Sequence, residues 1–340
     1  DTPLGKRAGL RWHRQGAPRV LCLHGWLDNA ASFLPLAPRL DELDVFALDF
    51  PGHGNSEHRH LTARYHFIDY LWDVEEVLNA LQWDDCHLIG HSMGAAVAAI
   101  YSAGAPERIR SLVMLDALGP ISVAAKGSTE RLRRSLFKNR LKRRPPRQFS
   151  SIDEMVKARC EYSGLSEAAS RLICERSAQK TGNHYAWKSD PALNWISSLI
   201  MTDNQALDFL QNIKAPVLSL MATPDAPWSS KQKTAARKKA IAHGRYETIA
   251  GHPALGLELD LVGGRDVASH LARHLSVLGF DVGLDHSRAL DVEAFFQLNL
   301  PLDGALHHQV FITGDFAVDD NRAADHSVRH CKLSLSASRV

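Results

Sequence analysis

The chain has 340 residues, 45% of them hydrophobic and 23% charged, and its formal net charge at pH 7 is +2. This length is enough for one large domain or two with a sizeable buried core. The near-neutral charge balance argues against a dedicated nucleic-acid-binding protein. No apolar run approaches the length of a membrane span, so stable membrane insertion is not expected. The five cysteines show no paired spacing, which favours a reducing, cytoplasmic environment.

Short apolar runs alternate with helical patterns through the first third of the chain. After an expected edge hairpin at 10–18, we expect strands at 19–23, 44–49, 86–90 and 109–115, and helices at 31–40, 65–81 and after Gly94. This alternation predicts right-handed crossovers and a mostly parallel sheet. Functional residues are therefore expected at the carboxyl ends of the strands.

A Gly-His-Ser-Met-Gly sequence at 90–94 joins the apolar run at 86–90 to an Ala-rich run. Gly90 and Gly94 predict a turn so tight that a Cβ atom at either position would clash. The turn lifts Ser92 out of the backbone at the N-terminus of a helix, where the dipole and the backbone N–H groups favour negative charge. That setting suits a serine nucleophile that attacks a carbonyl carbon.

A His-Gly-Trp sequence directly follows the strand expected at 19–23. The step from His24 to Gly25 lets the chain turn sharply and leaves the next N–H directed into a cleft. We therefore expect the backbone N–H groups of Trp26 and Met93 to form an oxyanion hole. The alternative is a plain strand-to-loop turn in which the tryptophan only packs.

The alternation stops between 121 and 212. This segment is polar and helical in pattern and follows a strand at the sheet end where Ser92 is expected, so it predicts a cap over the site. The basic run from Arg131 to Arg147 is typical of a solvated helix face. Attraction of acidic substrates or of an anionic surface is the alternative.

The alternation resumes with a strand at 215–221, a basic helix at 231–242, a last core strand at 245–249 and a closing helix at 267–278. The core domain is therefore expected at 1–120 and 213–278, with the cap at 121–212 between its two parts. Residues 279–340 lack clear periodicity and are expected to form a C-terminal appendage with no assigned function.

Three features occur in a fixed order along the chain. His24-Gly25-Trp26 comes first, the motif around Ser92 second, and His252 last, after an acidic residue and the last core strand. Because these motifs occur in this order, residues 10–278 resemble a member of the α/β-hydrolase superfamily. The sequences Leu-Asp-Ala-Leu-Gly-Pro at 115–120 and Trp-Lys-Ser-Asp-Pro at 187–191 resemble, more narrowly, its serine-hydrolase-like branch. The resemblance implies an α/β-hydrolase fold, with a mostly parallel, doubly wound sheet and an inserted helical cap.

The resemblance also implies a Ser-His-acid triad. Ser92 would attack an acyl carbon, His252 would take the serine proton and later donate it to the leaving alcohol, and a carboxylate would orient His252. Asp225 stands shortly after the strand at 215–221, where most superfamily members place the acid. Asp116 lies inside the motif shared with the narrower branch, and we favour it. For both residues the alternative is a turn-forming or capping role.

The activity implied by the resemblance is that of a serine carboxylic ester hydrolase, which cleaves small or medium acyl or aryl esters through an acyl-enzyme. A C–C hydrolase, lactonase, thioesterase or perhydrolase would use the same residues, and a non-catalytic binding member of the fold is the alternative of another class. The candidate substrate contacts are His24, Gly25, His91, Trp187 and Trp195.

The histidines form no zinc-type pattern and no dinucleotide or P-loop motif occurs, so we expect no metal and no organic cofactor. The expected partner is a small ester.

Overall fold

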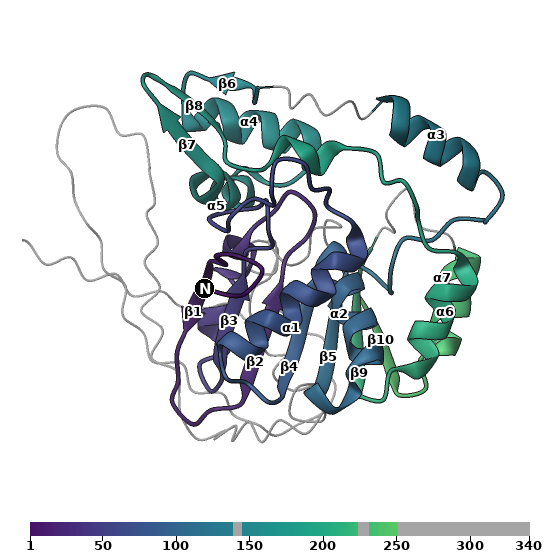
Figure 1. Ribbon diagram of the computed structural model, residues 1–340. Helices are drawn as coiled ribbons and strands as arrows, with labels where there is room; N and C mark the ends of the chain where they lie inside the picture. The colour runs from purple at the N-terminus through teal and green to yellow at the C-terminus, as the bar shows by residue number, and fades with distance from the viewer. Residues whose placement is uncertain (139–144, 224–230, 251–340) are drawn as a thin grey trace, which may run out of the picture. The chain divides into compact units, whose positions relative to one another are not determined.

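Seven strands of the described chain form a central sheet in the order β1-β3-β2-β4-β5-β9-β10 (Figure 1). Their bounds are Gly9–Trp12 (β1), Arg19–Leu23 (β2), Asp44–Leu48 (β3), Cys86–His91 (β4), Ile109–Leu115 (β5), Val217–Thr223 (β9) and Gly244–Ala250 (β10). Every neighbouring pair is parallel except β1 with β3. The predicted mostly parallel sheet is confirmed.

The computed structural model describes residues 1–138, 145–223 and 231–250. The chain has two units, Asp1–Val282 and Gly283–Val340, and all described residues lie in the first. The helix predicted at 267–278 and the extension predicted at 279–340 lie outside the described residues.

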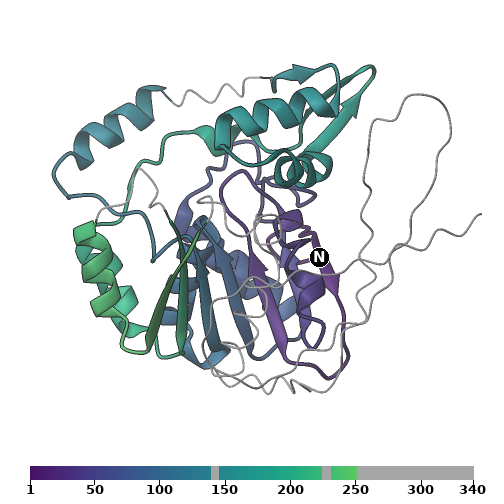
Figure 2. The same ribbon diagram turned by 180° about the vertical axis from the view of Figure 1, so that it is seen from behind.

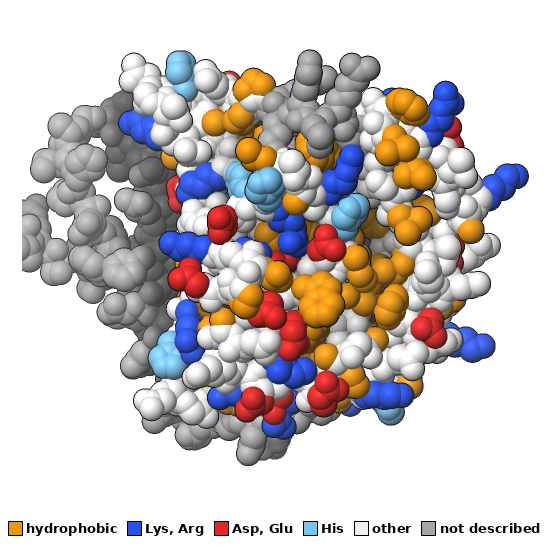
Figure 3. Space-filling view, viewed as in Figure 1, with side chains coloured by type: hydrophobic (Ala, Val, Ile, Leu, Met, Phe, Trp, Pro, Cys, Tyr) orange, Lys and Arg blue, Asp and Glu red, His pale blue; other side chains and the backbone are white. Residues whose placement is uncertain are grey.

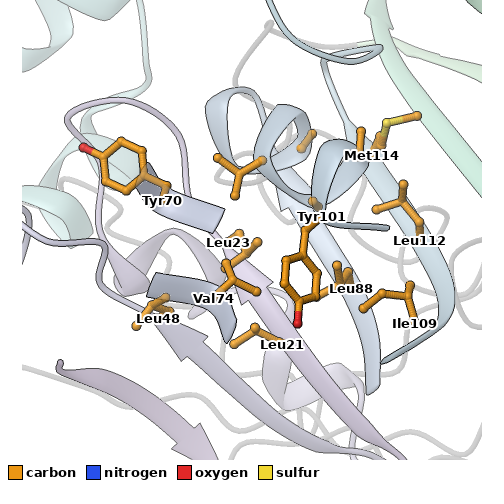
Figure 4. Close-up of a cluster of buried hydrophobic side chains, with 14 of the residues drawn as sticks. Leu21, Leu23, Leu48, Tyr70, Val74, Leu88, Tyr101, Ile109, Leu112 and Met114 are labelled. Carbon is orange, nitrogen blue, oxygen red and sulfur yellow. The ribbon is translucent and has the colours of Figure 1, made fainter. Parts of the chain in front are cut away.

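The central strands β2, β4 and β5 are mostly apolar and almost entirely buried, because both of their faces are covered. Side chains alternate between the two faces, since successive residues of a strand point in opposite directions. Leu21, Leu88 and Leu112 pack with the helices α1 (Tyr70–Ala80) and α2 (Met93–Gly104), and Figure 4 shows part of this cluster. Their neighbours Val20, Ile89 and Val113 belong to a second cluster on the opposite face.

Two short 3-10 helices, η1 (Ala30–Phe33) and η2 (Ala37–Arg39), contribute Phe33 and Ala37 to this second cluster. Figure 2 shows that face of the sheet. The single helix predicted at 31–40 is thus two short turns, separated around Leu34. Pro38, inside η2, lacks the N–H that a continuous α-helix would need there.

The hairpin predicted at 10–18 is wrong. β1 pairs antiparallel with β3, with Gly9 opposite Leu48, and both edges of β2 are taken by β3 and β4. A strand as apolar as β2 needs a neighbour on each side and cover on both faces. The half-buried β1 therefore occupies the sheet edge, where Arg11 pairs with Asp44 of β3 at 2.8 Å.

The segment between β5 and β9 holds the helices α3 (Ser128–Lys138), α4 (Ile152–Ser163), α5 (Glu167–Ser177) and α6 (Asp203–Asn212). It also holds the 3-10 helix η5 (Pro191–Asn194) and a second, antiparallel sheet in the order β6-β8-β7 (Gln148–Phe149, His184–Trp187 and Ala178–Thr181). The helices agree with the predicted helical character of this segment. The three strands were not predicted, because each has only two to four residues, too few for a recognisable strand pattern.

The remaining described elements are two 3-10 helices, η3 (Phe67–Asp69) and η4 (Pro106–Arg108), and the basic helix α7 (Lys231–Ala240). η3 leads directly into α1, so the helix predicted at 65–81 begins later as an α-helix. α7 ends at Ala240, close to the predicted 231–242.

Candidate active site

Ser92 stands alone between the last residue of β4 and the first residue of α2. Its backbone has φ 49° and ψ −111°, a left-handed conformation that is strained for any residue with a Cβ atom. The Ser92 N–H donates to the carbonyl of Leu115 in β5 at 2.9 Å, which holds the turn against the neighbouring strand. The turn leaves the Ser92 side chain half-buried at the carboxyl edge of the sheet.

The two glycines around Ser92 allow this conformation. A Cβ atom on Gly90 would lie 2.5 Å from the backbone N of Ala95, and one on Gly94 would lie 2.0 Å from the carbonyl oxygen of Leu23. Both distances are far inside van der Waals contact. The predicted reason for the motif, close approach of strand and helix, is confirmed.

The loop after β2, residues His24–Asn29, turns sharply beside Ser92. Gly25 has no room for a side chain, since its Cβ would lie 2.7 Å from Asp28 Oδ2 and 2.9 Å from His91 Nδ1. The Asp28 N–H closes the turn on the Gly25 carbonyl at 3.2 Å. Trp26 is 38% exposed, with its ring edge against His53. The oxyanion role of the Trp26 and Met93 N–H groups stays a prediction.

His24 is fully buried, and both of its ring nitrogens are engaged. Nε2 accepts from the backbone N–H of Phe50 at 3.0 Å, so Nδ1 carries the proton and donates to the carbonyl of Gly25 at 2.7 Å. Burial lowers the pKa of His24, which keeps the ring neutral in this arrangement. Through these hydrogen bonds His24 links the loop after β2 to the loop after β3. Its contact with substrate stays a prediction.

A buried charge cluster lies under the same loop. Asp28 forms an ion pair with Arg159 of α4 and lies 3.6 Å from Nδ1 of His91. Burial alone would raise the pKa of Asp28, but His91 and Arg159 outweigh it and the pKa is lowered. His91, predicted as a substrate contact, is buried here beside Asp28.

Two further side chains join the loops after β2 and β3 to α5. Asn29 donates through Nδ2 to the carbonyl of Ile173 at 3.0 Å and to Ser177 Oγ at 2.7 Å. Asp49 pairs with Arg176 at 2.7 Å and accepts from the N–H of Ala30, also at 2.7 Å. Sequence reasoning did not single out these residues: Asp28 and Asn29 directly follow the His-Gly-Trp motif, but Arg159 and Arg176 are too distant in sequence to be recognised as partners of this region.

Asp116, the favoured acid, directly follows β5, the neighbour of β4. Its N–H donates to the Leu220 carbonyl at 2.8 Å, and its Oδ1 accepts from the N–H of Ala222 at 3.3 Å. The backbone N–H of Ser92 is hydrogen-bonded to the carbonyl of Leu115, the residue before Asp116. Ser92 and Asp116 therefore lie at the carboxyl ends of adjacent strands. His252 and the alternative acid Asp225 lie outside the described residues.

The two tryptophans predicted to contact substrate occupy different surroundings. Trp187, in β8, packs edge-on against Phe149 within the hydrophobic cluster of the second sheet. Trp195 packs against the main core cluster, and the guanidinium of Arg64 lies 5.5 Å from its ring centre. Both are half-buried, and their contact with substrate stays a prediction.

Asp190, in the Trp-Lys-Ser-Asp-Pro motif at 187–191, has a structural role. It is buried, its Oδ2 accepts from the hydroxyl of Tyr65 at 2.8 Å, and its N–H donates to the carbonyl of Gly52 at 2.9 Å. The motif therefore fastens this part of the segment to the loop after β3.

Within the described ranges, no group of three or more His, Cys, Asp or Glu side chains is arranged to hold a metal ion. None of the helices in those ranges combines the length and the apolar character that a bilayer-spanning helix requires.

Comparisons with known proteins identify the family of this chain. The family model for the alpha/beta hydrolase fold matches residues 18–149. The chain is 33% identical over 227 residues to a serine hydrolase-like protein of Danio rerio, covering 65% of this chain and 70% of that protein. It is 31% identical over 207 residues to serine hydrolase-like protein 2 of Homo sapiens, covering 58% of this chain and 65% of that protein.

Solved structures give the same result. The crystal structure of a hypothetical protein from Pseudomonas aeruginosa superposes with a TM-score of 0.75 at 32% identity, covering 81% of this chain and 98% of that one. A thioesterase domain from the curacin biosynthetic pathway, at 21% identity and a TM-score of 0.68, shares the fold. The chain belongs to the serine-hydrolase-like branch of the α/β-hydrolase superfamily.

Proposed function

We propose that this chain is a serine carboxylic ester hydrolase that works through an acyl-enzyme formed on Ser92. The observation that carries the proposal is the strained turn at Ser92, with φ 49°, between β4 and α2. A protein gains no stability from such strain, and a turn of this kind presents one hydroxyl at the N-terminus of a helix. Small or medium acyl or aryl esters are the proposed substrates.

The proposed reaction has two balanced steps. In the first, His252 takes the proton of the Ser92 hydroxyl while the Ser92 oxygen attacks the ester carbonyl carbon. The tetrahedral intermediate then expels the alcohol, which receives that proton from His252. In the second, His252 takes a proton from water while the water oxygen attacks the acyl carbon; the tetrahedral intermediate then breaks its bond to Ser92 Oγ, which receives that proton from His252 as the acid is released. The N–H groups of Trp26 and Met93 would hold the oxyanion in both steps, which is worth about 3 kcal/mol for one donor.

Asp116 is the proposed acid. Two features support it: its position at the strand end next to Ser92, and a backbone φ of 50°, which is strained in the same way as that of Ser92. The Oδ1 atom of this carboxylate accepts from the N–H of Ala222 at 3.3 Å, which fixes the side chain at the end of β5.

The nucleophile is tested by covalent labelling with a fluorophosphonate and by turnover of p-nitrophenyl acetate. We expect the parent chain to be labelled and to turn over the ester, and Ser92→Ala to lose both. A parent chain that is neither labelled nor active would favour a non-catalytic binding member of the fold. Undiminished turnover by Ser92→Ala would contradict the proposal, and faster turnover of thioesters or lactones than of matched esters would correct the substrate class.

The choice of acid is tested by comparing Asp116→Asn with Asp225→Asn. Asparagine at 116 still accepts from the Ala222 N–H, so the strand end is preserved while the charge is lost. We expect kcat to fall by about 10⁴ in Asp116→Asn, the size of the effect when a triad acid becomes an amide, and to change little in Asp225→Asn. The opposite result would move the acid to Asp225.

A further inference from the structure

α3 buries a polar face and exposes apolar side chains. Ser135 is fully buried and its hydroxyl meets that of Ser198 at 2.7 Å, while Arg131 and Ser128 are half-buried. Leu132 is 45% exposed and Phe137 is 70% exposed. This is the reverse of the pattern by which a surface helix normally packs on its protein.

The exposed apolar side chains of α3 lie on one side of the helix. At about 100° per residue, Leu132, Leu136 and Phe137 fall on an arc about 140° wide that adjoins the buried polar face and that also includes Thr129 and Arg133. Leu136 is 59% exposed, and Leu199, next to the serine that contacts Ser135, is 75% exposed. The apolar arc of α3 therefore has no hydrophobic counterpart among the residues that the structure describes.

Basic side chains accompany this arc. Arg133, Arg134 and Lys138 are exposed, and α3 carries a single acidic residue, Glu130. Within the described part of the chain, Arg131, Arg133, Arg134 and Lys138 form no ion pair, so their charge is not neutralised there. In Figure 3, apolar and basic side chains gather together over α3, at the upper right.

From these observations we propose that α3 docks on an anionic lipid surface, with Leu132, Leu136 and Phe137 at the level of the headgroups and acyl chains. A basic helix with Leu and Phe on one side and Lys or Arg around them has this chemistry. Nucleic acid would use the charges but gives no reason to expose leucines and a phenylalanine. A protein groove would need to accept a convex helix, and the charges favour lipid phosphates. The binding is peripheral and does not depend on the proposed esterase activity.

The experiment is co-sedimentation of the full chain with vesicles. We expect binding to vesicles of equal parts phosphatidylcholine and phosphatidylglycerol, little binding to phosphatidylcholine alone, and loss of binding as salt is raised. Leu136→Ser/Phe137→Ser should weaken binding about tenfold or more, by the apolar area withdrawn from the bilayer. Arg133→Ser/Arg134→Ser should weaken it about fivefold per charge and flatten its salt dependence.

Matched controls carry the same changes elsewhere. Tyr162→Ser removes a side chain that is 74% exposed on α4, and Lys231→Ser/Lys239→Ser removes two exposed charges from α7; both should bind as the parent does. No binding to the anionic vesicles, or equal loss in the controls, would overturn the proposal. So would a lowered thermal transition in Leu136→Ser/Phe137→Ser, because the face would then be covered by another segment of this chain. Binding of a single-stranded RNA that survives the apolar substitutions would also replace lipid as the partner.

Discussion

At the scale of single residues, the turn at Ser92 is governed by the space between backbones. The helix α2 starts so close to β2 that the Leu23 carbonyl occupies the place where a side chain at position 94 would begin. At the other end of the same helix, Gly104 is exposed and has no atom within 4 Å of the place its Cβ would take. The two glycines of α2 therefore allow the same substitution to be compared in opposite surroundings.

Gly94→Ala should lower the free energy of unfolding by about 3 kcal/mol or more, since backbone has to move to make room for the methyl group. Gly104→Ala should raise it by about 0.5–1 kcal/mol, because alanine loses less conformational entropy in a helix. Urea unfolding followed by tryptophan fluorescence measures both. Similar effects for the two variants would show that the close approach at position 94 is not what requires glycine.

His53 links stability to pH. Burial, and then the nearby His24, lower the pKa of His53 to about 3, against about 6.5 in an unfolded chain. Below about pH 6.5 the unfolded state therefore binds a proton that the folded state does not, and stability falls as the pH is lowered. The expected slope from this group is about 1.4 kcal/mol per pH unit between about pH 6 and pH 4. Urea unfolding of parent and His53→Gln over this range should show a shallower slope in the variant; parallel slopes would contradict the assignment.

At the scale of elements, buried polar contacts join α4 and α5 to the loops that surround Ser92. Arg159 reaches Asp28 from α4, and Arg176 reaches Asp49 from α5. An ion pair removed from water is costly to break from one side, since it leaves the other charge buried and unpaired. These pairs therefore hold the loop next to Ser92 in one conformation.

Arg159→Met should lower the free energy of unfolding by about 3–5 kcal/mol, because Asp28 stays buried without its cation. Arg171→Met, on the exposed side of α5, is the matched control and should change stability little, since its partners Glu167 and Asp153 are solvated. Thermal unfolding measures both. Adding Asp28→Asn to Arg159→Met should restore part of the loss; equal losses in the two single variants, or no recovery, would argue against the buried pair.

At the scale of the whole molecule, the described fold belongs to the unit Asp1–Val282. The Pseudomonas aeruginosa structure is covered over 98% of its length by 81% of this chain, so a complete fold of this family fits in that share. The human relative, serine hydrolase-like protein 2, extends further, since the matched region spans 65% of it.

A chain that ends at Val282 should therefore keep the cooperative urea transition of the full chain, with an unchanged midpoint, and should keep fluorophosphonate labelling at Ser92. The reason is that the sheet, both of its clusters and the turn at Ser92 are built from residues before that point. A lost or broadened transition would show that residues after Val282 take part in the core.

Much of the fold could be predicted because many of its elements follow from patterns of residues that are neighbours in the sequence. Apolar runs predicted the central strands, and the glycines at 90 and 94 predicted the tight turn at Ser92. The position of β1 could not be predicted, since pairing across a sheet joins Gly9 to Leu48 without any local signal. The strands β6, β7 and β8 were missed because each has only two to four residues, too few to show a recognisable alternation.

For the candidate site, the sequence by itself determined the tight turn at Ser92 and the order of the motifs, because a strand, a tight turn and a helix follow one another within a few residues. Only the tertiary structure decided that Asp28 meets Arg159, that Asp49 meets Arg176, and that α3 turns its serines inward and its leucines outward. The reason is physical: local patterns depend on backbone geometry over a few residues, whereas these contacts depend on which surfaces meet when distant segments are packed and desolvated.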